Sequence, residues 1–278
     1  METVTLEGIT LHLTHPDDLN LAWVGQEELL AQVLAAWLVV APEDLPLNPR
    51  LLGKPGVGKT TLAYAAGRRL GRPVYIFQAT VDTRPEDLLI TPVISEAGRI
   101  QYVASAVVTA MIKGGVAIID EANRMSEKSW ASLAPLLDNR RYVESIVAGL
   151  KIKAHPDFRL CVTMNDDAST FEVPEYIHSR LMPQIVVDFP DREEERRILA
   201  QNLPFAPDVV LDYVVSFLQQ AHGAHERYTV RDGINIARYA LKLAAGRPAR
   251  PFHRPDIREA LVQAVRQVLG EEALDYLP

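Results

Sequence analysis

The sequence predicts an α/β fold, a parallel sheet with helices on both faces, followed by a smaller all-helical part. Short apolar segments alternate with helical patterns between about residues 50 and 190, which is typical of strands buried on both faces. After Pro190 the strand pattern stops and helical patterns continue. With 278 residues the chain is long enough for both parts. We therefore expect an α/β core over residues 1–190 and a helical domain over residues 191–278.

The expected elements follow from local patterns. An N-terminal extended piece and a helix over 26–40 precede the sheet, whose strands are expected at 50–53, 73–79, 115–121, 158–165 and 183–189. Two hairpins are expected near 93–102, with its turn at Glu96-Ala97-Gly98, and near 142–153. Asp191 with Glu194 predicts a capping box. Further helices are expected at 207–221, 230–244 and 255–269.

Composition narrows the class of protein. Apolar residues make up 48% and charged residues 23%, as in ordinary soluble proteins. The net charge of −7 argues against a nucleic-acid clamp held by bulk electrostatics. The single cysteine, Cys161, excludes an internal disulfide and is expected to be buried in a strand. The N-terminus is acidic where a signal peptide is basic, and the longest apolar run is too short to span a bilayer. We expect a cytoplasmic protein.

A glycine-rich segment lies between the first strand of the sheet and a helix. Its residues, Gly53-Lys54-Pro55-Gly56-Val57-Gly58-Lys59-Thr60, match G-x-x-x-x-G-K-[ST], and Thr61 follows. Glycines let backbone N–H groups turn toward phosphate oxygens, and the helix N-terminus faces the same anion. Lys59 is expected on the β- and γ-phosphates and the Thr60 hydroxyl on Mg²⁺. The alternative is a strand-to-helix turn that holds no ligand.

Two adjacent acids end the strand at 115–121. Asp120 is expected to hold the Mg²⁺ together with Thr60, and Glu121 to deprotonate an attacking water. The alternative is a pair of solvated acids at a strand end. The glycine-rich loop about 60 residues upstream favours the catalytic interpretation.

Three further residues are candidates for the same chemistry. Asn165 ends the next strand, where its amide is suited to hydrogen-bond the water or the γ-phosphate. Arg180 precedes the last strand, and we interpret it as an arginine finger given to a neighbouring subunit rather than a solvated charge. Arg231, at the start of a helix, is suited to contact the nucleotide of its own subunit, although Arg238 on the same helix is an alternative.

These elements, in this order, resemble those of the AAA+ ATPases. Within that superfamily the sequence looks most like the MoxR group, which includes the CbbQ and NorQ types. The residues that carry the resemblance are Val24-Gly25-Gln26, the segment DEANR at 120–124 and the segment TVRDGINIARYA. The resemblance implies a ring, usually hexameric, with ATP at subunit interfaces. It also implies a helical lid over 191–278, with the backbones of Val24 and Gly25 lining the adenine pocket.

The resemblance also implies a use for the energy of hydrolysis. MoxR-type proteins remodel or activate other proteins, often metalloenzymes or partners that carry a von Willebrand factor A domain. Hairpins like those expected here lie near a central pore or a partner-binding face in that clade. We expect no further domain after the helices, so that specificity comes from loops or from a separate chain.

Two alternatives to this function remain open at the level of sequence. One is a nucleic-acid-linked motor of the McrB-like type, which the net charge disfavours. The other is a nucleotide-dependent scaffold with little turnover, against which Glu121 and Asn165 argue. Trp23, Trp37 and Trp130 are interpreted as packing residues.

Overall fold

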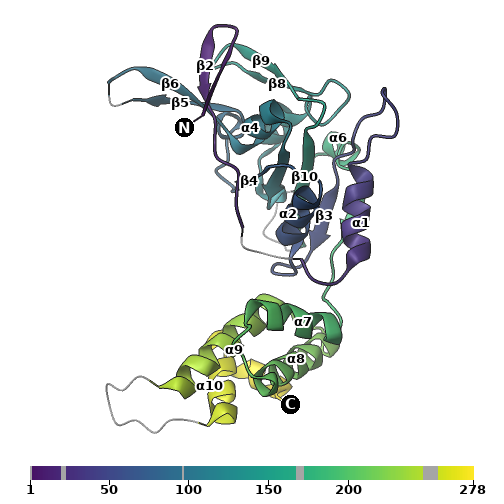
Figure 1. The fold of residues 1–278 in the computed structure, drawn as a ribbon, viewed down its shortest axis with the longest axis vertical. Helices are drawn as coiled ribbons and strands as arrows, with labels where there is room; N and C mark the ends of the chain where they lie inside the picture. The colour runs from purple at the N-terminus through teal and green to yellow at the C-terminus, as the bar shows by residue number, and fades with distance from the viewer. Residues whose placement is uncertain (1, 20–22, 96, 167–171, 247–255) are drawn as a thin grey trace. The chain divides into compact units, whose positions relative to one another are not determined.

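A parallel sheet of five strands is the main element of the computed structural model, which describes residues 2–19, 23–95, 97–166, 172–246 and 256–278 (Figure 1). All of its strand pairs are parallel, in the order β11-β3-β10-β7-β4. Every strand falls where the sequence predicts one, which confirms the α/β prediction. The strands are β3 (Arg50–Gly53), β4 (Val74–Gln78), β7 (Val116–Asp120), β10 (Arg159–Asn165) and β11 (Gln184–Val186).

The described chain divides into two units, each with its own core. The first consists of Met1–Trp23, Glu28–Gly53 and Gly58–Val187. The second joins Asp188–Pro278 with two short segments of the N-terminal half, Val24–Glu27 and Lys54–Val57.

Several helices belong to the first unit together with the sheet. They are α1 (Glu27–Ala36), α2 (Lys59–Arg69), α3 (Pro85–Leu88), α4 (Ala106–Lys113), α5 (Glu127–Leu133) and α6 (Glu175–His178), with a 3₁₀ turn η1 (Ala122–Arg124). The helix expected over 26–40 is α1, and it ends earlier than predicted, at Ala36. Leu38 and Val40 continue the apolar pattern in the sequence but are 61% and 77% exposed. Without burial, this β-branched stretch has no reason to stay helical.

The two faces of the sheet bury alternate residues of the same strands. Ile119 and Val162 belong to the main core cluster, together with residues of α4 such as Met111. Their neighbours Ile118 and Cys161 are also fully buried, and strand alternation turns them to the opposite face. Burial raises the pKa of the Cys161 thiol, so this cysteine is an inert packing residue, as predicted.

The two predicted hairpins are present, and the first is part of a larger sheet. Strands β1 (Thr3–Leu6), β2 (Ile9–His12), β6 (Ile100–Ala104) and β5 (Ile90–Ile94) pair in that order, with β2 parallel to β6. The local pattern gave no sign that the N-terminal strands would join this hairpin. Glu96, placed in its turn, lies outside the described residues. The second hairpin is β8 (Tyr142–Ser145) with β9 (Leu150–Lys153).

Helices make up the second unit. They are α7 (Arg192–Asn202), α8 (Asp208–Gly223), α9 (Val230–Ala245), α10 (Ile257–Leu269) and a 3₁₀ segment η2 (Glu271–Tyr276). They enclose a separate core around Phe217 and Ile236. The capping box predicted at α7 is half formed, because Asp191 accepts a hydrogen bond from the Glu194 N–H while the Glu194 carboxylate binds the Gln26 N–H instead. Within the described ranges, every helix is too short or too polar to cross a membrane.

Gly115 should be intolerant of a side chain. A Cβ at this position would lie 2.7 Å from the Pro73 carbonyl oxygen, which belongs to the backbone and cannot swing away. We predict that Gly115→Ala lowers the free energy of unfolding by about 1–3 kcal/mol in denaturant titrations. Gly223→Ala is the control, because a Cβ there meets no described atom within 4 Å, and its effect should stay within about 0.5 kcal/mol. Equal unfolding midpoints for the two variants would refute the packing argument.

Glu195 makes the stability of the second unit depend on pH. Burial raises the pKa of this carboxyl from 4.5 to about 7, although Gln219 donates a hydrogen bond to it. Between these values the folded state holds a proton that the unfolded chain has released, so stability is lost as the pH rises through this window. Glu195→Gln should therefore raise the free energy of unfolding at pH 8 by on the order of 1–3 kcal/mol, and by little at pH 4.5.

The control for this prediction is Glu193→Gln, on the exposed side of the same helix. Urea titrations of both variants at pH 4.5 and pH 8 measure the effect. A stability difference between Glu195→Gln and the unmodified protein that does not change with pH would contradict the prediction.

Candidate functional site

The glycine-rich loop runs from the end of β3 to the start of α2. Gly56 and Gly58 have left-handed backbone angles, with φ of 85° and 98°, which favour glycine. Gly58 is the N-cap residue of α2 and has no side chain to bind the N–H groups of the first turn. The backbone N–H groups at the N-terminus of a helix point toward an anion that binds there.

Lys59 begins α2 and is almost fully buried. Its Nζ donates a hydrogen bond to the Gly53 carbonyl oxygen, 2.9 Å away, so the side chain folds back over the loop. A buried ammonium group at the loop provides the positive charge that a phosphate chain requires.

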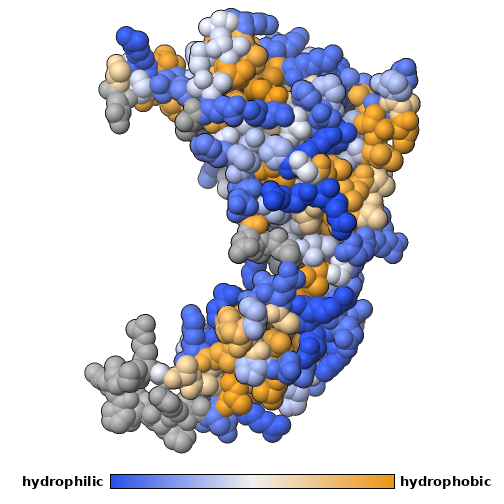
Figure 2. Space-filling view, viewed as in Figure 1, coloured by the Kyte–Doolittle hydropathy of each residue, from blue (hydrophilic) through white to orange (hydrophobic). Residues whose placement is uncertain are grey.

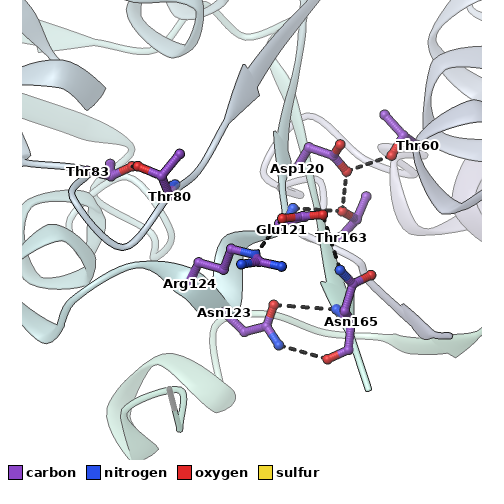
Figure 3. A network of polar contacts seen from close by, with 9 residues as sticks. All are labelled: Thr60, Thr80, Thr83, Asp120, Glu121, Asn123, Arg124, Thr163 and Asn165. Atoms are coloured by element: carbon purple, nitrogen blue, oxygen red, sulfur yellow. Dashed lines mark hydrogen bonds and ion pairs between the residues drawn. The ribbon is translucent and has the colours of Figure 1, made fainter. Parts of the chain in front are cut away.

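Thr60 and Asp120, the two predicted Mg²⁺ ligands, lie side by side (Figure 3). The Thr60 hydroxyl donates to Asp120 Oδ1 at 2.6 Å, and Thr163 on β10 donates to the same oxygen at 2.5 Å. A hydroxyl and a carboxylate oxygen suit a hard cation such as Mg²⁺. Sequence reasoning missed Thr163, although a hydroxyl inside an otherwise apolar strand was a signal.

The backbone turns away from the direction of β7 at Glu121, the residue after the strand ends. It has a left-handed backbone, with φ of 53°, which costs a residue with a side chain about 1–2 kcal/mol. The Thr163 hydroxyl accepts a hydrogen bond from the Glu121 N–H and so holds this conformation. One carboxylate oxygen, Oε1, accepts from Asn165 Nδ2 at 3.2 Å. The other lies 2.5 Å from Arg124 Nε, in an ion pair without hydrogen-bond alignment.

Asn165 is fixed from its backbone side. The Asn123 side chain donates to the Asn165 carbonyl oxygen at 2.8 Å and accepts from its N–H at 3.4 Å (Figure 3). These contacts leave the Asn165 amide directed at Glu121. The sequence analysis used Asn123 and Arg124 only as part of a motif, and the structure shows that both contact predicted site residues.

Arg180 belongs to a different cluster. Its Nε lies 3.4 Å from Asp138 Oδ2, and Nη1 donates to the Tyr176 carbonyl oxygen. Hydrogen bonds from Arg140 hold the pKa of Asp138 at about 2, so this carboxylate stays charged. Arg180 lines a pocket of about 440 Å³. Leu45, in the loop that follows α1, lines the same pocket. The contacts of Arg180 thus involve neither the glycine-rich loop nor Asp120.

Thr61 follows Thr60 in α2 of the first unit, and the second unit contains the other predicted residues. A Cβ on Gly25 would lie 2.7 Å from Glu194 Oε1, and one on Gly56 would lie 2.7 Å from Thr229 Oγ1. Thr229 caps α9, so that Arg231 lies in the first turn of this helix and is exposed. Val24 is half-buried, and Lys54 lies over the ring of Phe189.

Comparisons with known proteins agree with this fold and this loop. Residues 50–181 match the family model described as AAA domain (dynein-related subfamily). The structure of Thermotoga maritima RuvB, titled a Holliday junction branch migration motor, covers 90% of this chain and 72% of its own, with a TM-score of 0.58 and 18% identity. Such a likeness shows the fold alone. The fold is therefore that of AAA+ proteins, and residues 50–181 are the segment that is similar to the AAA domain family.

Relatives by sequence share most of the chain. Uncharacterized proteins of Staphylococcus haemolyticus and Staphylococcus aureus are 28% and 27% identical over 236 residues. Each alignment covers 83% of this chain and 89% of the relative. The similarity thus extends beyond residues 50–181, the segment that matches the AAA domain model.

Thr163 should raise the affinity for Mg²⁺ although it is not itself a ligand. Thr163→Val removes the hydroxyl that orients Asp120 and leaves the Glu121 N–H without its acceptor. We predict a roughly 10–100-fold loss of Mg²⁺ affinity, measured by calorimetry with ADP present. The control is Thr83→Val, which also removes a hydroxyl that accepts a backbone N–H, but at Thr80. Equal Mg²⁺ affinity in the two variants would show that the Thr163 hydroxyl does not contribute to the metal site.

Proposed function

We propose that this protein is a Mg²⁺-dependent ATPase of the MoxR type. It hydrolyses ATP at the interfaces of a ring, hexameric as in the MoxR group, and uses the energy to remodel or activate a partner protein. The observation that carries the proposal is the contact of Thr60 with Asp120, beside a Glu121 carboxylate that is held by Asn165. In a P-loop domain this arrangement has the groups needed for hydrolysis as well as for binding.

ATP binding uses the loop and the first turn of α2. Lys59 neutralises charge on the β- and γ-phosphates, and the backbone N–H groups around Gly56 and Gly58 bind phosphate oxygens. Thr60 and Asp120 would hold Mg²⁺, which neutralises the negative charge that develops on the phosphate oxygens. The hydroxyl of Thr163 keeps Asp120 turned toward Thr60.

Hydrolysis uses the carboxylate of Glu121. It takes the proton of a water that attacks the γ-phosphate, the task of a general base. Asn165 and Arg124 each hold one of its oxygens, which fixes the plane of the carboxylate. Asn165 is also suited to hydrogen-bond the water or the phosphate without adding negative charge.

The position of Arg180 supports an active site shared between subunits. Its side chain contacts Asp138 and Tyr176 and makes no described contact with Thr60 or Asp120 of its own subunit. Arg180 is therefore suited to act on the nucleotide of a neighbouring subunit. Apolar side chains gather over α1 and the loop that follows it (Figure 2). Leu45 and Leu47 of this loop are exposed and line the pocket beside Arg180. An exposed apolar patch beside a charged group supports a subunit interface here.

Contacts inside the second unit support the nucleotide roles of Val24, Gly25 and Arg231. Gly25 packs on Glu194, and Gly56 of the phosphate-binding loop packs on Thr229, two residues before Arg231. Arg238 lies two helical turns further along α9, about 10 Å from Arg231 along the axis. Arg231 is therefore the better candidate for the nucleotide contact.

The hairpins support a protein as the partner. Ile94 and Ile100 face each other across β5 and β6 and are 80% and 65% exposed, and Ile146 on the second hairpin is 93% exposed. Tyr102, by contrast, packs against the core. Exposed apolar tips suit a protein surface better than a phosphate backbone. The likeness to RuvB, a branch migration motor, is one of fold and does not favour DNA here.

The proposal is tested with two variants that separate binding from hydrolysis. Lys59→Ala should abolish ATP binding in calorimetry, because the charge partner of the phosphates is lost. Glu121→Gln should keep ATP binding and slow hydrolysis by on the order of 10²-fold or more. Lys128→Ala and Glu127→Gln, on the exposed surface of α5, are the controls. ATP affinity that survives in Lys59→Ala, or unchanged turnover in Glu121→Gln, would count against the proposal.

The shared site is tested by mixing subunits. Arg180→Ala should bind ATP normally but lose most of its turnover, by roughly 10³-fold or more. Mixtures of Arg180→Ala with Lys59→Ala should regain part of the activity, because some interfaces then pair an intact loop with an intact arginine. The absence of recovery at any ratio, in assemblies shown to contain both variants, would rule out action between subunits.

A further inference from the structure

Trp23 lies against the phosphate-binding loop. Its ring carbon Cζ3 is 3.1 Å, and Cη2 4.0 Å, from the position that a Cβ on Gly58 would occupy. Gly58 is the residue before the loop lysine and the N-cap residue of α2. The indole is only partly buried, so it covers the loop without being enclosed by the core.

The indole nitrogen of Trp23 has no hydrogen-bond partner among the described residues. Nε1 is nevertheless shielded from solvent. A buried donor without an acceptor costs about 1–3 kcal/mol, and such groups in a native fold call for an explanation. Trp37 shows the ordinary arrangement, because it is 1% exposed and its Nε1 donates to the Leu160 carbonyl oxygen at 3.0 Å.

We propose that Trp23 is a nucleotide-contacting residue whose indole forms a wall of the nucleoside pocket and whose Nε1–H donates to an acceptor on the base or ribose. The inference rests on the proposed nucleotide site. A triphosphate bound at Gly58 would have its ribose and base next to the loop, on which the Trp23 ring packs. An aromatic face next to a purine contributes stacking, and the ligand would supply the acceptor that Nε1 does not find among the described residues.

The three tryptophans of the chain make this testable by fluorescence. Trp37 and Trp130 are each 1% exposed, Trp37 against β10 and Trp130 in α5. We expect the surroundings of these two buried rings to stay the same when a ligand binds. Trp23 is the one whose emission should change on addition of Mg²⁺ and ADP. Trp23→Phe keeps an aromatic ring but lacks the N–H, whereas Trp23→Ala lacks both.

The experiment combines emission with calorimetry for the full-length protein and ADP. We expect a saturable emission change that Trp23→Phe abolishes and Trp37→Phe retains. We expect ADP affinity to fall by roughly 3–10-fold in Trp23→Phe and further in Trp23→Ala. A merely structural role would lower thermal stability without a graded effect on affinity. Should Trp23→Ala fail to fold, the conservative Trp23→Phe variant carries the test.

Two outcomes would overturn the inference, and they are distinguishable. If the unmodified protein binds ADP and Trp23→Phe binds it equally well, with the emission change intact, Trp23 does not contact the nucleotide while the proposed function stands. If the unmodified protein gives no heat of binding with ADP or ATP, the proposed function fails together with the inference.

Discussion

One oxygen of the Asp120 carboxylate joins three separate elements of the sheet region. It accepts hydrogen bonds from Thr60 at the start of α2 and from Thr163 in β10, and it ends β7 itself. Carboxyl ends of parallel strands meet at one edge of a sheet, so this contact links the phosphate-binding loop to the strands that carry the other polar groups. A carboxylate without these donors would be costly at a partly buried strand end.

Glu121 depends on the same contact for its separate role. In a continuous strand, Asp120 and Glu121 would point to opposite faces of the sheet. The left-handed backbone at Glu121 ends the strand and redirects the side chain toward Asn165 and Arg124. Thr163 accepts the Glu121 N–H while it donates to Asp120, so one hydroxyl sets the directions of two adjacent acids. The strain at Glu121 is the cost of turning its side chain toward Asn165 and Arg124.

Local patterns predicted what depends on local physics. Continuous apolar runs placed the five parallel strands, and the spacing of Gly53, Gly58 and Lys59 placed the loop. What the patterns missed depends on contacts between distant segments. The pairing of β2 with β6 and the partners of Thr163 are of this kind. The packing of Trp23 on Gly58 is another, because nothing in either segment indicates the other. The early end of α1 reflects exposure of Leu38 and Val40, which hydrophobic periodicity alone does not reveal.

The central claim is that Asp120, held by two hydroxyls, binds a divalent cation together with a nucleotide. Electron paramagnetic resonance of Mn²⁺, used in place of Mg²⁺, measures this directly through the loss of the free-ion signal. The unmodified protein should bind one Mn²⁺ per chain when ADP is present, and Asp120→Asn should bind it at least about tenfold more weakly. Equal Mn²⁺ binding by the two proteins, with equal ADP affinity, would contradict the account.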